Sequence, residues 1–151
     1  MGLRDLDPSD GHVVDVVFAG LSPRSRYLRF QSVAVELSAV TRRTLTEVDG
    51  ISHVALAAVA QGQPIGIVRI IDLGNRRGEI AVEVVDSWQG RGVGSRLLRA
   101  GRNRAAYLGY RELVCEVLVV NAGAQAALRR VFSDMQVRRD GSALSIAMPI
   151  E

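Results

Sequence analysis

Three closely spaced glycines are the residues whose type and spacing most clearly suggest chemistry in this sequence. Gly90, Gly92 and Gly94 allow a tight turn and let another molecule approach the backbone closely. A helix is expected to begin near Gly94, and the free N–H groups at a helix N-terminus, with the positive end of the helix dipole behind them, form an anion site. The stretch therefore predicts a cradle for phosphate groups, by default for a pyrophosphate.

Two carboxylates precede the glycines at a spacing that places them together. Glu79 and Glu83 alternate with the apolar residues Ile80, Val82 and Val84, which is the pattern of a β-strand with one apolar face. Because the side chains of a strand alternate between its two faces, both carboxylates are expected on the same face. One continuous segment thus carries an anion cradle and two acidic groups.

The remaining pattern predicts the elements that must position these residues. We expect strands at 3–6, 53–60, 64–73, 79–85, 112–120 and 143–149, and helices at 10–20, 24–31, 38–48, 94–109 and 124–135. Three of these strands follow one another through short turns, which indicates an antiparallel meander. The order is β-α-α-(α)-β-β-β-α-β-α-β, with no linker or repeat, so we expect one α/β domain spanning 1–151.

Composition excludes several classes of function. Hydrophobic residues make up 48% of the chain and charged residues 23%, as in globular proteins. We find no apolar run long enough to cross a bilayer and no secretion signal, which predicts a cytoplasmic protein without a membrane partner. The net charge is only +3, and aromatic residues, at 5%, are too few for a base-stacking surface. We therefore expect no nucleic-acid partner.

Two familiar glycine-rich loops do not fit this stretch. A Walker A loop needs a lysine after its last glycine, but Ser95 and Arg96 follow Gly94, and the chain contains no lysine. A dinucleotide-binding fingerprint needs the spacing G-x-G-x-x-G in a first βαβ unit. Here the glycines have a different spacing and an antiparallel meander precedes them.

The segment Gln89–Gly94 resembles the (Arg/Gln)-x-x-Gly-x-(Gly/Ala) cofactor loop of the GNAT superfamily of acyl-CoA-dependent N-acyltransferases. The order of elements around it is similar to that of the superfamily over nearly the whole chain. The resemblance implies a layered α+β fold, with a mixed, mostly antiparallel central sheet flanked by helices. It also implies acetyl-CoA as co-substrate and no metal.

The resemblance further implies a set of cofactor contacts. Backbone N–H groups should hold the pyrophosphate of CoA, from Gln89, Gly90, Arg91, Gly92, Val93, Gly94 and Ser95. Backbone groups of Val84, Val85 and Asp86 should pair with the pantetheine arm like an added strand. The asparagine that contacts the cofactor before the following helix could be Asn121 or could be replaced by Gln125. A splay between strands 79–85 and 112–120 should admit the thioester.

A narrower resemblance lies upstream. The segment Leu21–Phe30 is similar to the L-S-x-x-S-R-Y-L-R-F segment of bacterial Pat-type protein lysine acetyltransferases, as is Glu79-Ile80-Ala81. This resemblance implies that the acceptor is a protein lysine, such as one on an acyl-CoA synthetase. It assigns Glu79 as the general base, in a semi-apolar slot, while Glu83 could assist, bind a cationic acceptor or be the base itself. The oxyanion donor would be a backbone N–H such as that of Val85.

Other interpretations remain open from the sequence. Many members of the superfamily protonate the leaving thiolate with a tyrosine, but Phe132 stands where we would seek it, so water is expected to serve. A small amine could replace the protein lysine as acceptor. A non-catalytic acyl-CoA-binding module would show the same cradle, and a homodimer is left open.

Overall fold

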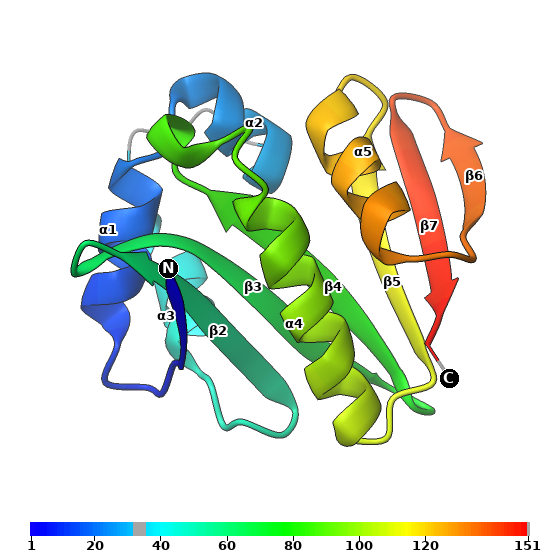
Figure 1. Ribbon diagram of the computed structural model, residues 1–151, viewed down its shortest axis with the longest axis horizontal. Helices are drawn as coiled ribbons and strands as arrows, with labels where there is room; N and C mark the ends of the chain where they lie inside the picture. Colours follow the sequence, from blue (N-terminus) through cyan, green and yellow to red (C-terminus); the bar gives the residue numbers. More distant parts are fainter. Residues whose placement is uncertain (32–35, 151) are drawn as a thin grey trace.

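A mixed β-sheet runs through the molecule, with helices on both of its faces (Figure 1). The computed structural model describes residues 1–31 and 36–150. Its strands are β1 (Gly2–Asp5), β2 (His53–Ala60), β3 (Gln63–Gly74), β4 (Arg77–Val84), β5 (Glu112–Leu118), β6 (Gln136–Asp140) and β7 (Ala143–Pro149). Its helices are α1 (Gly11–Ala19), α2 (Pro23–Phe30), α3 (Ala39–Thr46), the short 3₁₀ turn η1 (Asp86–Trp88), α4 (Val93–Tyr107) and α5 (Ala122–Val131).

The seven strands described here lie in the order β1-β2-β3-β4-β5-β7-β6. All neighbouring strands are antiparallel except β4 and β5. Those two central strands are parallel, as expected when a helix, here α4, forms the crossover between them. The expectation of a mixed, mostly antiparallel sheet flanked by helices is thus confirmed.

The two helical layers bury opposite faces of the sheet. Helix α4 crosses one face so closely that a Cβ on Gly101 would meet Val68 at 3.0 Å and Ile80 at 3.3 Å. Helix α5 lies beside α4 on that face, in front of β5 and β7 (Figure 1). Helices α1 and α3 cover the other face and pack against each other. Helix α4 thus packs against β4 on one face, while α1 packs against β3 on the other.

Local capping fixes where α2 and α3 begin. The Ser22 hydroxyl accepts a hydrogen bond from the Ser25 N–H, with Pro23 at the first helical position. Ser38 caps α3 in the same way, through the Thr41 N–H. The Ser22 cap thus fixes the start of α2, which lies across one end of the sheet (Figure 1).

The structure also differs from the predicted pattern at the C-terminal end. Helix α5 ends at Val131, and β6 follows as an edge strand that the sequence did not predict. Every residue of β6 is exposed, so the strand has no buried face to produce an apolar alternation. Within the described residues, no helix has the length and apolar character needed to cross a membrane.

Candidate active site

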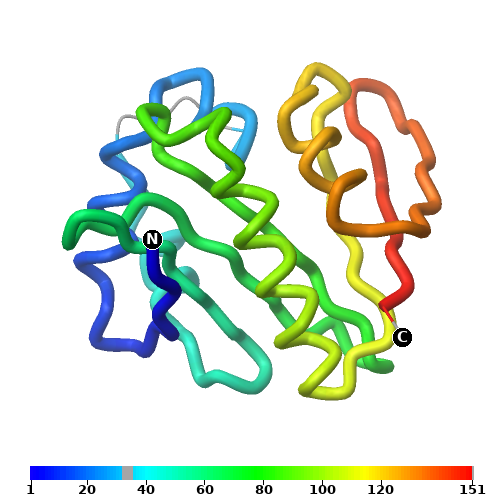
Figure 2. The backbone as a smooth tube through the Cα atoms, in the orientation of Figure 1, coloured from blue at the N-terminus to red at the C-terminus, as the bar shows by residue number. Residues whose placement is uncertain are grey.

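The central strands β4 and β5 part in the middle of the sheet. Their pairing extends only from Arg77 with Glu112 to Glu79 with Val114. Beyond that point the two strands diverge, and α4 and α5 diverge with them (Figure 2). A cavity of about 480 Å³ fills the opening, lined by residues of β4, β5, α2, α4 and α5 and by the glycine turn. The splay predicted from the sequence is therefore present.

The edge of β4 presents backbone groups of Val82 and Val84 to this cavity, although the Val84 carbonyl also accepts a hydrogen bond from the Gln89 side chain. The Val85 N–H donates to Ile65 O at 2.9 Å, on the β3 side. Because backbone groups alternate in direction along a strand, those of Val82 and Val84 point the other way, towards the gap left by β5. Val84 also lines the cavity. An extended chain could add to this edge as a strand would.

The glycine turn closes one end of the cavity. Gly90 and Gly92 have φ values of 75° and 82°, which a residue with a side chain rarely adopts. Among the described residues, the backbone N–H groups of 90–95 make no hydrogen bond to another backbone group. Gly92 is also the N-cap of the 15-residue helix α4. The free N–H groups and the helix dipole together form the anion site that the spacing predicted.

Side chains on either side of η1 brace the turn. The Gln89 amide donates to Val84 O at 2.9 Å and to Ser25 Oγ at 3.2 Å. The Asp86 carboxylate accepts from the Ser22 N–H at 2.8 Å. Burial acts to raise the pKa of Asp86, but hydrogen bonds from Ser22 and Ser25 outweigh it and lower the pKa below its ordinary value. Asp86 and Gln89 thus tie the anion site to the start of α2.

The predicted cofactor residues divide into two groups. Seven line the cavity: Val84, Gln89, Gly90, Gly92, Gly94, Ser95 and Asn121. Four do not: Val85, Asp86, Arg91 and Val93. Val85 is buried, and both of its backbone groups are engaged, because its carbonyl accepts from the Trp88 N–H. Its N–H is therefore not free to serve as the oxyanion donor that the sequence suggested.

A second hollow lies on the opposite face of the sheet. This trough, of about 540 Å³, runs across β4, β5, β7 and β6. Cys115 and Glu116 line both the trough and the cavity, so the two hollows adjoin where β4 and β5 part. Glu79 lines the trough and is exposed rather than enclosed in a semi-apolar slot. It stands at the last paired position before the strands diverge.

The second predicted carboxylate has a different environment. Glu83 lines the cavity but is only 6% exposed. Arg29 Nε donates to Glu83 Oε2 at 2.6 Å, and Arg69 Nε lies 3.9 Å from Glu83 Oε1. Arg69 itself is 1% exposed, and burial lowers its pKa although Glu83 acts in the opposite direction. Glu83 therefore balances two guanidinium groups beneath α2.

Several residues at the site were missed by sequence reasoning. Leu28, Arg29 and Arg130 line the cavity, and Cys115 lies at the junction of the cavity and the trough. Burial, together with the nearby charge of Glu79, raises the pKa of the Cys115 thiol to about 12. Leu28 and Arg29 belong to the Leu21–Phe30 segment, whereas Arg130 and Cys115 belong to no motif, and only the three-dimensional structure brings all four together.

An anion cradle at the mouth of a cavity between diverging strands is the arrangement expected of acyl-CoA-dependent acyltransferases. A family model for the Acetyltransferase (GNAT) family matches residues 25–132, and the chain belongs to this family. It is accordingly an acetyl-CoA-dependent N-acetyltransferase that uses acetyl-CoA as co-substrate. Among the described residues, no cluster of His, Cys, Asp or Glu side chains could hold a metal ion.

Solved structures extend this comparison. The GNAT domain of S. lividans PAT is 26% identical to this chain, and the two structures superpose with a TM-score of 0.88. The match covers 97% of this chain and 89% of that domain. A GNAT-family acetyltransferase from Streptococcus pneumoniae shares the fold at 19% identity, with a TM-score of 0.76 and 99% coverage of both chains. A cAMP-binding acyltransferase from Mycobacterium smegmatis is 25% identical, with a TM-score of 0.65; the match covers 99% of this chain but only 43% of that protein. A comparison with curated protein sequences finds no match.

Proposed function

We propose that this acetyltransferase modifies the side-chain amine of a protein lysine, with Glu79 as the general base. The observation that carries the proposal is the junction of the two hollows at Cys115 and Glu116, with Glu79 beside it. A donor in the cavity and an acceptor in the trough would meet there from opposite faces of the sheet. The resemblance of Leu21–Phe30 to Pat-type enzymes supports lysine as the acceptor.

The residues of the cavity fit the parts of the co-substrate. The N–H groups of 90–95 would bind the pyrophosphate, and the free edge of β4 at Val82 and Val84 would bind the pantetheine amides. Acetyl-CoA then supplies a thioester, an acyl group activated for transfer to an amine. Arg130, at the α5 side of the same cavity, is available to a further phosphate.

The acceptor must lose a proton to become a nucleophile. A lysine amine is protonated at neutral pH, and the exposed Glu79 carboxylate is placed to accept its proton. Glu83 is less suited to this role because it is buried between Arg29 and Arg69. The amine nitrogen then bonds to the acetyl carbon, the carbon–sulfur bond breaks, and the second proton lost by the nitrogen passes through water to the leaving thiolate.

Substitution of Glu79 by Gln tests this proposal. We expect Glu79→Gln to lower kcat at pH 7 by about a hundredfold, the lower range for a general base, while the affinity for acetyl-CoA is kept. CoA release is measured with n-butylamine and with a purified acyl-CoA synthetase, whose acetylated lysines are mapped by mass spectrometry. Glu112→Gln is the control, because it removes another carboxylate from β5 that lines neither the cavity nor the trough.

The outcomes separate the alternatives. Full activity of Glu79→Gln at pH 7 would show that another group is the base. Turnover of a panel of small amines, without modification of lysine in any protein or peptide, would replace the lysine acceptor with a small amine.

Three further features belong to the proposal. We propose that residues 1–151 work as one acyltransferase domain, because a single sheet joins all seven described strands. We propose a cytoplasmic location, where acetyl-CoA is available.

We also propose a homodimer, because β1 and β6 expose every residue at the two edges of the sheet and edge strands readily pair. Analytical ultracentrifugation tests this oligomeric state.

A further inference from the structure

The trough beside Glu79 has a polarity that the proposed reaction alone does not explain. Two carboxylates, Glu79 and Glu116, lie at the end where it adjoins the cavity. The guanidinium of Arg138 lies at the other end, on β6. The trough is therefore negative at the reacting end and positive at the outer end.

Three of the charged side chains in the trough have no oppositely charged partner within the described part of the protein. The ion pairs found there involve neither Glu79, Glu116 nor Arg138. Arg77, which also lines the trough, differs because its Nε donates to Glu112 Oε1 at 2.8 Å. Glu116 has one polar neighbour, the amide of Gln31, at 3.4 Å. Three charged groups on one face thus remain available to a ligand.

Strand register sets the spacing of these groups. Glu116 is paired with Ser145 across β5 and β7, and Ser145 is paired with Arg138 across β7 and β6. Glu116 and Arg138 are therefore two strands apart in one row, which corresponds to about 10 Å between backbones. An extended peptide advances about 3.3 Å per residue. A residue three positions from a lysine would thus reach from one end of the row to the other.

We propose that the trough binds an extended acceptor segment in which an acidic residue lies about three positions from the target lysine. This inference rests on the proposed lysine acceptor and adds the class of segment that is selected. The lysine ammonium lies between Glu79 and Glu116, and the acidic side chain pairs with Arg138. Glu116 is a binding residue for the cation, whereas Glu79 takes its proton.

Paired peptides test the inference directly. The probes are acetylated, amidated heptapeptides with a central lysine, four inner alanines, and aspartate or arginine at both ends. We expect kcat/KM to be about threefold higher for the aspartate peptide, the size typical of an exposed ion pair. Arg138→Glu should reverse this preference. Glu116→Gln should raise KM for both peptides about fivefold.

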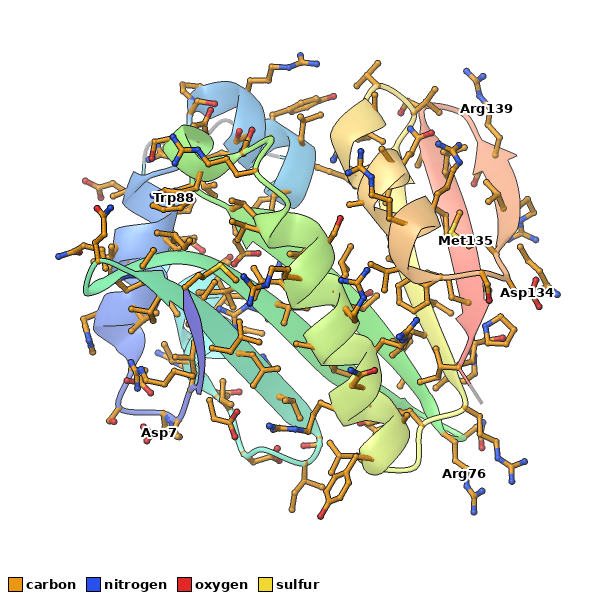
Figure 3. The ribbon with its side chains drawn as sticks, viewed as in Figure 1. Asp7, Arg76, Trp88, Asp134, Met135 and Arg139 are labelled. Atoms are coloured by element: carbon orange, nitrogen blue, oxygen red, sulfur yellow. The ribbon has the colours of Figure 1, made fainter. Side chains whose placement is uncertain are left out.

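Arg139→Glu is the matched control. It makes the same charge change on the next residue of β6, whose side chain points to the other face of the sheet. Arg139 bonds only to the nearby Gly141 O among the described residues and projects from the outer edge of the molecule (Figure 3). We expect this variant to keep the preference of the parent protein.

Binding and turnover together distinguish the two proposals. Fluorescence anisotropy of labelled versions of both peptides measures the preference without catalysis. If the aspartate peptide binds better but neither peptide is acetylated, the lysine acceptor is wrong while the charge selection holds. If Arg138→Glu keeps the original preference in both measurements, or the parent protein prefers the arginine peptide, the inference is overturned.

Discussion

Glu79 and Glu83 occupy the same face of the same strand, yet their surroundings are opposite. Glu79 is exposed at the point where β4 and β5 part, and it makes no ion pair among the described residues. Glu83 is buried beneath α2 and balances Arg29 and Arg69. Among the described residues, one carboxylate thus has no charged partner, while the other balances two cations.

The difference comes from what covers each end of the strand. Helix α2 packs against β4 near Glu83, so that residue is enclosed by the helix. Glu79 instead faces the open trough. A strand pattern can assign both residues to one face, but burial depends on the neighbouring element. The comparison therefore suggests separate roles: reaction for Glu79 and positioning of α2 for Glu83.

The largest expected effect on stability comes from Glu83→Gln. The substitution leaves two buried or half-buried guanidinium groups without their carboxylate, and breaking such a pair costs about 3 kcal/mol. Unfolding in urea, followed by circular dichroism, measures the loss. Glu112→Gln breaks the exposed pair with Arg77 and should cost less than about 1 kcal/mol. Equal losses for the two variants would remove the distinction between the buried and the exposed site.

A smaller, pH-dependent effect is expected from His53, behind Arg69. Burial and the charge of Arg69 lower the pKa of His53, whose Nε2 lies 3.3 Å from a guanidinium nitrogen. His53 is therefore protonated more easily in the unfolded chain than in the folded protein. Its neutral form contributes to the free energy of unfolding above the unfolded pKa of about 6.5, and this contribution is lost as the pH falls through the pKa of the folded protein. Thermal unfolding between pH 8 and 5 should show a steeper loss for the parent protein than for His53→Gln. Identical slopes would contradict the buried contact with Arg69.

The smallest effect concerns Cys115, the thiol whose pKa is affected by Glu79. Its pKa of about 12 keeps the thiol protonated at pH 7.5, so iodoacetamide should react much more slowly with it than with free cysteine. Because Glu79 contributes to the raised pKa, Glu79→Gln should accelerate alkylation a few-fold at pH 9. Glu83→Gln should leave the rate nearly unchanged in the folded protein. If Glu83→Gln accelerates alkylation and Glu79→Gln does not, then Glu83, and not Glu79, is the carboxylate that raises the pKa of Cys115.

The cofactor side of the site could largely be predicted from the sequence. The glycine turn, the strand before it and the helix after it are contiguous, so their spacing predicted the anion cradle near Gly90–Gly94. The splay beside it was implied by the resemblance to the family. The hydrogen bonds made by the backbone of Val85 and Asp86 could not be predicted from the sequence. Their backbone groups bond within the fold, to Ile65 and Gly20 among others, and a linear pattern does not reveal which groups are already engaged. The assigned catalytic and binding roles stay predictions.

The acceptor side could not be predicted because it is discontinuous. The trough draws residues from four strands, and one of them, β6, lacks an apolar alternation. Arg138 and Glu116 look like ordinary exposed charges in the sequence. They become a candidate binding row only through the register of β5, β7 and β6. The chain order of the fold was predictable, but this convergence required the three-dimensional structure.

The most direct test of the account is the pH dependence of acetyl transfer to a lysine peptide, compared between the parent protein and Glu79→Gln. A general base matters most where the amine is protonated, so the variant should be slower by about a hundredfold in kcat/KM at pH 7. Its deficit should shrink to less than about tenfold near pH 10, where lysine loses its own proton. A deficit of the same size at every pH, or none at pH 7, would contradict Glu79 as the residue that accepts the proton.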